Sequence, residues 1–104
     1  MTQHLIQLLL PLHNNEQQEF PKAYFVDVRA ILTDRFGGVT AFVRSPAIGL
    51  WKETKDEVSR DEVVMFEVIT DQLDTKWWAD YRLQLQDKFL QDEILIWATS
   101  IMKL

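Results

Sequence analysis

The chain contains no cysteine, only three glycines and three prolines, and no long run of apolar residues. The lack of cysteine excludes disulfides, thiolate metal sites and cysteine nucleophiles, and it mildly favours a reducing compartment. No window reaches the roughly 18 apolar residues that a membrane-spanning helix needs. The apolar stretch 5–10 lacks the basic flank and the cleavage site of a signal peptide. We therefore expect a cytoplasmic protein that does not bind a membrane.

Clusters of basic residues are also missing. The chain has 11 Lys and Arg against 16 Asp and Glu, which gives a net charge of −5. A surface that follows a nucleic-acid backbone needs clustered Lys and Arg to displace counterions from the phosphates. We therefore expect no nucleic-acid partner, and we interpret the acidic surface as an aid to solubility.

The 104 residues predict a single domain, 1–104, because no linker, repeat or low-complexity tract divides them. Pro21 suits the first position of a helix, Gly37 suits its left-handed end, and Asp74 suits the N-cap of a second helix. Alternating apolar residues mark the strands. The predicted elements are a strand at 4–12, a helix at 21–36, a hairpin at 39–70 with a return strand at 63–70, a helix at 75–90 and a strand at 94–101.

This order of elements is βαββαβ, the ferredoxin-like pattern of the α+β class. Right-handed crossovers place the first and third strands at the centre of a four-stranded antiparallel sheet of order 4-1-3-2. The two helices then cover one face. Pro46 and Gly49 interrupt the outgoing arm of the hairpin, which predicts a bulge or a bend there.

Alternation along the strands predicts which residues lie on each face of the sheet. The set that faces the helices is entirely apolar and makes an adequate core: Ile6, Leu8, Leu10, Ala41, Val43, Val64, Phe66, Val68, Ile94 and Ile96. The opposite set is also mostly apolar: Leu5, Gln7, Leu9, Thr40, Phe42, Arg44, Val63, Met65, Glu67, Ile69, Leu95, Trp97, Thr99 and Ile101.

An apolar patch of this size indicates a partner or a ligand. Such a face is commonly closed by a second copy, so we predict a homodimer with its sheets face to face. The strand order also makes Gln7, Glu67 and Arg44 candidates for one polar row across three strands. Three interpretations stay open: an ion pair that fixes sheet or dimer register, a polar-ligand site walled by Trp97 and Phe42, and a pair at an exposed edge.

Catalytic signatures are not evident. His4 and His13 lack the spacing of metal ligands, and no phosphate-binding loop, dinucleotide fingerprint or nucleophile elbow occurs, so we expect no metal and no cofactor. The paired carboxylates at 56–57, 61–62 and 92–93 are interpreted as solvated charge. Trp51 is less easily assigned. It either plugs the edge of the core, reaches a partner subunit, or lines a pocket with Lys52.

The runs R-F-G-G-V-T at 35–40, R-S-P-A at 44–47, G-L-W-K at 49–52 and D-E-I at 92–94 resemble a family of short uncharacterised bacterial proteins. The resemblance covers most of the chain. It implies a ferredoxin-like or dimeric α/β-barrel-type domain and no particular chemistry. The residues in this pattern that could contact a ligand are Arg44, Trp51 and Lys52.

Two functions from different classes are compatible with these observations. The first is a non-enzymatic homodimeric domain that binds a partner or a small ligand through the face without helices. The second is a small cofactor-independent enzyme resembling dimeric α/β-barrel monooxygenases or isomerases. The enzyme needs an ionisable side chain in a cavity between sheet and helices, and the helix-facing set contains none, so we favour the first.

Overall fold

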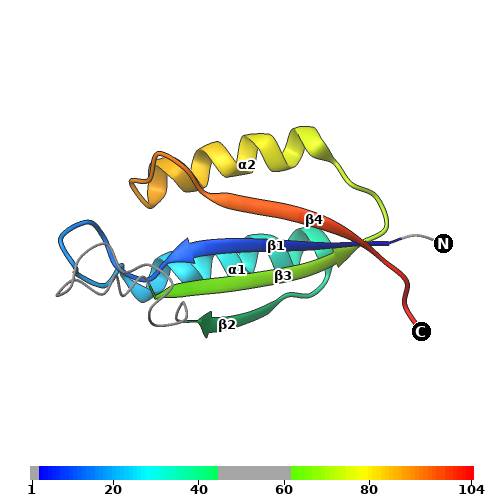
Figure 1. The fold of residues 1–104 in the computed structure, drawn as a ribbon, viewed down its shortest axis with the longest axis horizontal. Helices are drawn as coiled ribbons and strands as arrows, with labels where there is room; N and C mark the ends of the chain where they lie inside the picture. The colour runs from blue at the N-terminus through cyan, green and yellow to red at the C-terminus, as the bar shows by residue number, and fades with distance from the viewer. Residues whose placement is uncertain (1–2, 45–61) are drawn as a thin grey trace, which may run out of the picture.

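The structure is a computed structural model that describes residues 3–44 and 62–104. Its elements confirm the predicted βαββαβ order (Figure 1): β1 (Gln3–Pro11), α1 (Lys22–Phe36), β2 (Thr40–Arg44), β3 (Val63–Thr70), α2 (Thr75–Lys88) and β4 (Leu95–Ile101). The predicted bulge near Pro46 and Gly49, and the extension of the return strand towards Val58, lie outside the described residues.

The four strands form one antiparallel sheet of order β2-β3-β1-β4, which is the predicted 4-1-3-2 read from the other edge. β1 is central and pairs on both sides, so that Ile6 lies opposite Val68 of β3 and Ala98 of β4. The mostly apolar residues on both faces of β1 agree with this central position.

Local chemistry fixes both ends of α1. Pro21 is the N-cap, one position before the one predicted, with the extended ψ of 139° that a cap residue adopts. At the other end Gly37 takes the left-handed conformation, φ 79°, and its N–H donates to the Thr33 carbonyl over 2.8 Å. A side chain at this φ is strained, and glycine avoids that cost. Val28 and Leu32 are the buried residues of this helix.

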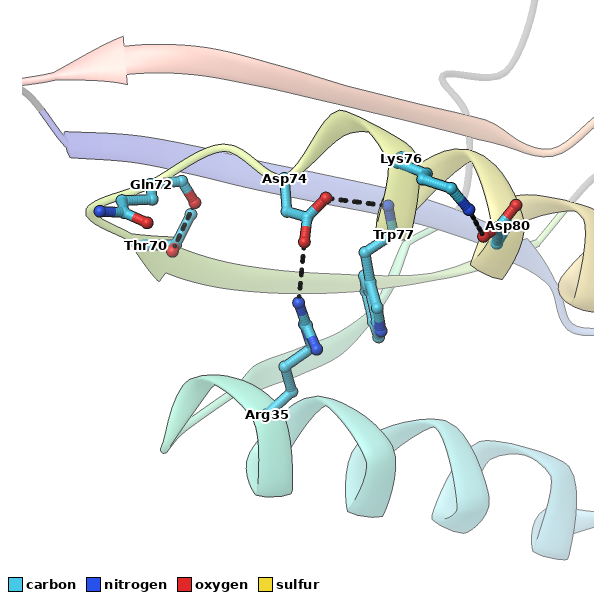
Figure 2. A network of polar contacts seen from close by, with 7 residues as sticks. All are labelled: Arg35, Thr70, Gln72, Asp74, Lys76, Trp77 and Asp80. Carbon is cyan, nitrogen blue, oxygen red and sulfur yellow. Dashed lines mark hydrogen bonds and ion pairs between the residues drawn. The ribbon is translucent and has the colours of Figure 1, made fainter.

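α2 begins at the predicted cap. The Asp74 carboxylate accepts a hydrogen bond from the Trp77 N–H over 3.1 Å, and its second oxygen accepts from Arg35 Nη2 of α1, also over 3.1 Å (Figure 2). Trp78, Tyr81 and Leu85 form the buried side of α2. Lys88 ends the helix, two residues before the predicted end.

The core lies between the helices and one face of the sheet. It confirms most of the helix-facing set, since Ile6, Leu8, Leu10, Val64, Phe66, Val68 and Ile94 are buried and Ile96 is partly buried. Ala41 was wrongly placed in the core: it is exposed, because β2 is an edge strand. Phe20, from the polar loop before α1, enters the core and contacts the Phe89 ring edge-on at 5.0 Å between centroids.

None of the helices in the described part of the chain is long and apolar enough to cross a membrane.

Candidate functional site

The face of the sheet away from the core, here called the open face, is the candidate site. Strand parity and register place on it the odd-numbered residues of β1, β3 and β4 and the even-numbered residues of β2. In Figure 1, α1 is seen behind β1 and β3, so it does not cover the face that these strands turn to the viewer.

Large apolar side chains lie exposed on the open face. Ile69 is 43% exposed, Leu95 53% and Trp97 38%, while Leu5 and Leu9 between them are half-buried. Met65 is different, because it is 3% exposed although it belongs to the same face. The face is therefore an apolar surface whose exposed part lies mainly on β4 and at the Ile69 end of β3. Apolar patches of this kind mark interaction sites on soluble domains.

A row of residues crosses the open face through all four strands. Thr40, Glu67, Gln7 and Trp97 lie opposite one another in turn. At its centre Gln7 Nε2 donates to Glu67 Oε2 over 2.6 Å, and it also lies 3.5 Å from the Met65 sulfur. Both Gln7 and Glu67 are half-buried. Gln7 and Glu67 thus lie in one row as predicted, and a hydrogen bond between an amide and a carboxylate joins them.

Arg44 does not lie in this row, and the predicted row was wrong on this point. The register places Arg44 opposite Val63, whereas Thr40 lies opposite Glu67. Four residues of strand separate Arg44 from the row, which is about 13 Å of backbone. The prediction failed because alternation assigns a residue to a face but leaves its position along the neighbouring strand unspecified. Thr40 was missed for the same reason.

The other predicted site residues are only partly tested by the structure. Trp97 lies directly opposite Gln7, and the backbone of Phe42 lies opposite Met65. Trp51 and Lys52 lie outside the described residues. The structure therefore brings together Gln7, Glu67 and Trp97 from the predicted set.

The space between α2 and β4 bears on the enzyme alternative, because that alternative requires an ionisable group in a cavity between sheet and helices. A cavity of about 210 Å³ lies at this place, lined by Ile6, Trp78, Ile96 and one ionisable side chain, Arg82. Its volume is below the roughly 300 Å³ at which small-molecule sites begin. Among the described residues no group of three or more His, Asp or Glu is arranged to hold a metal ion.

Tyr81 is the ionisable group most affected by burial in the described part of the chain. Burial raises the pKa of the Tyr81 hydroxyl far above its ordinary value, and the negative charge of Asp27 adds to this shift. The hydroxyl is buried without a hydrogen-bond partner among the described residues. A phenol held neutral in this way packs the helices and is not poised to exchange protons near neutral pH.

Comparison with known proteins supports the fold and goes no further. No protein-family model matches the chain, and no curated protein matches it. Among solved structures, the chain is similar to a phage SAM lyase in complex with S-methyl-5'-thioadenosine, with a TM-score of 0.60 and 11% identity over 97% of this chain and 90% of that one. At this identity the likeness shows a shared fold. The protein is thus a small α+β domain of the ferredoxin-like type, with an apolar open face.

Proposed function

We propose that the protein is a non-enzymatic domain that forms a homodimer through its open face. The observation that carries this proposal is the exposure of Ile69, Leu95 and Trp97 on one side of a sheet whose other side packs against the helices. Two such sheets can stack about 10 Å apart and remove these side chains from water. A two-fold arrangement is the simplest one, because the same patch then serves both copies.

The hydrogen bond between Gln7 and Glu67 gives this interface a polar centre. A polar group inside an otherwise apolar contact favours arrangements that satisfy it and disfavours those that do not. The pair would therefore fix the relative position of the two copies. This role corresponds to the register-fixing interpretation of the polar row, with Gln7 in place of Arg44.

Sedimentation velocity at micromolar concentration tests the proposal. We expect the mass of a dimer for the wild-type protein and of a monomer for Trp97→Glu, which puts a charge among the exposed apolar side chains of the open face. Leu83→Glu is the matched control, because Leu83 is 59% exposed but lies on α2. Circular dichroism confirms that each variant folds. A wild-type monomer, or a Leu83→Glu variant that dissociates like Trp97→Glu, would overturn the proposal.

A second candidate is a small-ligand domain or cofactor-independent enzyme, and the shared fold with the phage SAM lyase favours it. We infer that, if this candidate is correct, the protein binds S-methyl-5'-thioadenosine or forms it from SAM. Calorimetry with the thioadenosine and chromatography of SAM after incubation test the two possibilities. Heat-denatured protein provides the control. Absence of both binding and turnover would exclude this ligand and this reaction and leave the homodimer unaffected.

The bacterial family suggested by the motifs at 35–40, 44–47 and 49–52 remains part of the proposal. Two of its three candidate ligand residues, Trp51 and Lys52, are outside the described residues.

A further inference from the structure

A cavity of about 480 Å³ lies where β1 ends and where β3 and β4 begin. Four apolar residues from the end of the open face form its floor: Leu9, Pro11, Val63 and Leu95. The loop that follows β1 and the connection between α2 and β4 supply its walls, and both are seen at the same end of the molecule in Figure 1. The volume is within the range of small-molecule sites.

The loop that forms one wall is held by its own hydrogen bonds. Asn14 Oδ1 accepts from the backbone N–H groups of Glu16 and Gln18, over 2.8 and 2.9 Å. The Leu12 N–H donates to the Glu62 carbonyl over 3.0 Å, which ties the loop to the start of β3. This wall is therefore formed before any ligand arrives, and a preformed site loses less entropy on binding.

The opposite wall is fixed in a similar way. Gln86 Nε2 donates to the Asp92 carbonyl over 2.9 Å, and the Gln91 N–H donates to the Gln86 carbonyl over 2.9 Å. The turn between α2 and β4 is thus anchored to the last turns of the helix. Glu93 follows directly and lines the cavity.

The charge of the lining indicates what the cavity can accept. Glu62 and Glu93 line it from either side of β1, and none of the described lining residues is a lysine or arginine. His13 lines it as well and lies 4.0 Å from the Glu19 carboxylate. Two carboxylates above an apolar floor attract a cation and repel a phosphate or carboxylate. An organic cation fits both parts of this lining, because its apolar body suits the floor and its charge suits the carboxylates.

We propose that this cavity binds a small organic cation, with its apolar body on Leu9 and Leu95 and its charged group towards Glu62 and Glu93. The proposal goes beyond self-association, because the charged lining comes from outside the strands of the open face. The floor residues Leu9 and Leu95 belong to both surfaces, so a molecule bound on them and a second copy of the chain compete for the same side chains. The cavity also differs from the row at Gln7 and Glu67, which contains no part of this lining.

Three probes that share a phenylethyl group and differ in charge test the proposal by nuclear magnetic resonance of ¹⁵N-labelled protein. They are phenethylamine, which is a cation, 2-phenylethanol, which is neutral, and 3-phenylpropionate, which is an anion. We expect phenethylamine to shift the amide signals of 9–17 and 91–95 saturably. The neutral probe should bind roughly three- to tenfold more weakly, and the anion more weakly still. Absent saturable shifts at these amides, or equal affinity for the anion, would overturn the proposal.

Charge-neutral variants locate the cation. Glu62→Gln and Glu93→Gln should each weaken phenethylamine roughly three- to tenfold and leave 2-phenylethanol unchanged. The matched controls are Glu16→Gln, in the same loop, and Asp92→Asn, next to Glu93; neither lines the cavity. If the cavity variants bind as the controls do, the proposal is wrong. Sedimentation of each variant is recorded in parallel, so that a loss of self-association is distinguished from a loss of binding.

Discussion

Asp74 joins the two helices through a single carboxylate. One oxygen caps α2 by accepting from the Trp77 N–H, and the other accepts from Arg35 Nη2 of α1 (Figure 2). The Arg35 guanidinium also lies 4.5 Å from the centroid of the Trp77 ring. Replacing Asp74 therefore removes a helix cap and an ion pair together, and suitable variants separate the two contributions.

The two contributions differ in size. Loss of an N-cap side chain costs about 0.5–2 kcal/mol, because a backbone N–H loses its partner. The ion pair is partly exposed, with side-chain exposures of 40% and 53%, so it contributes at most about 1 kcal/mol. We expect Asp74→Ala to lower the free energy of unfolding by about 1–3 kcal/mol. Asp74→Asn keeps a good cap and loses only the charge, and should cost about 0.5 kcal/mol.

Urea denaturation followed by circular dichroism measures both variants. In a domain of this size, 1 kcal/mol corresponds to about 4–8 °C in Tm, so thermal melting gives an independent check. Asp80→Ala is the matched control, since Asp80 forms an exposed ion pair with Lys76 over 3.1 Å but caps nothing. If Asp74→Asn is as destabilising as Asp74→Ala, the stabilisation comes from the ion pair, and the assignment of the cap is refuted.

Three further substitutions test other parts of the structure. The pKa of Tyr81 is raised in the folded state, so the free energy of unfolding of the wild-type protein falls as the pH rises above 10 and the unfolded state ionises more readily. Tyr81→Phe removes this group and should lose less stability above pH 10 in urea denaturation. The same pH dependence in both proteins contradicts this. Gly37→Ala forces a side chain into φ 79° and should lower the Tm measured by calorimetry by the equivalent of about 1 kcal/mol. Gly38→Ala is the control, because Gly38 has open space around it and no positive φ, and its Tm should not change. Equal Tm values for the two variants contradict this. Glu67→Gln should tighten self-association roughly tenfold in sedimentation equilibrium, and Asp34→Asn on α1 should leave it unchanged; a Glu67→Gln variant with wild-type affinity contradicts burial of this carboxylate.

Much of the fold could be predicted because the relevant signals are local. The alternation of Ile6, Leu8 and Leu10 identifies both a strand and its core face. Gly37 and Asp74 mark helix ends because a left-handed turn and an unpaired N–H each require a particular side chain. Strand order then follows from the handedness of the crossovers. Each of these inferences needs only a few neighbouring residues.

The candidate site was less predictable because it depends on non-local geometry. A shift of two or four residues along a strand keeps every side chain on its face, so alternation could not show that Thr40, and not Arg44, lies opposite Glu67. The cavity at the end of the sheet was missed for a related reason. It combines residues from three connecting segments and three strands, and no spacing in the sequence indicates that Glu62 and Glu93 approach the same space.

The corrected register limits what can cover the open face. Glu67 lies opposite Gln7 on one neighbouring strand and opposite Thr40 on the other, and neither residue carries a positive charge. Burying this carboxylate with only an amide as donor costs free energy, whereas burying the surrounding apolar side chains gains it. Whatever covers the face must therefore bring apolar surface to Trp97 and Ile69 and either leave water at Glu67 or supply a donor there. The second copy proposed above would bring the apolar surface, because its own open face carries the same side chains. Its Gln7 amide is a neutral donor that would offset only part of the cost of burying Glu67.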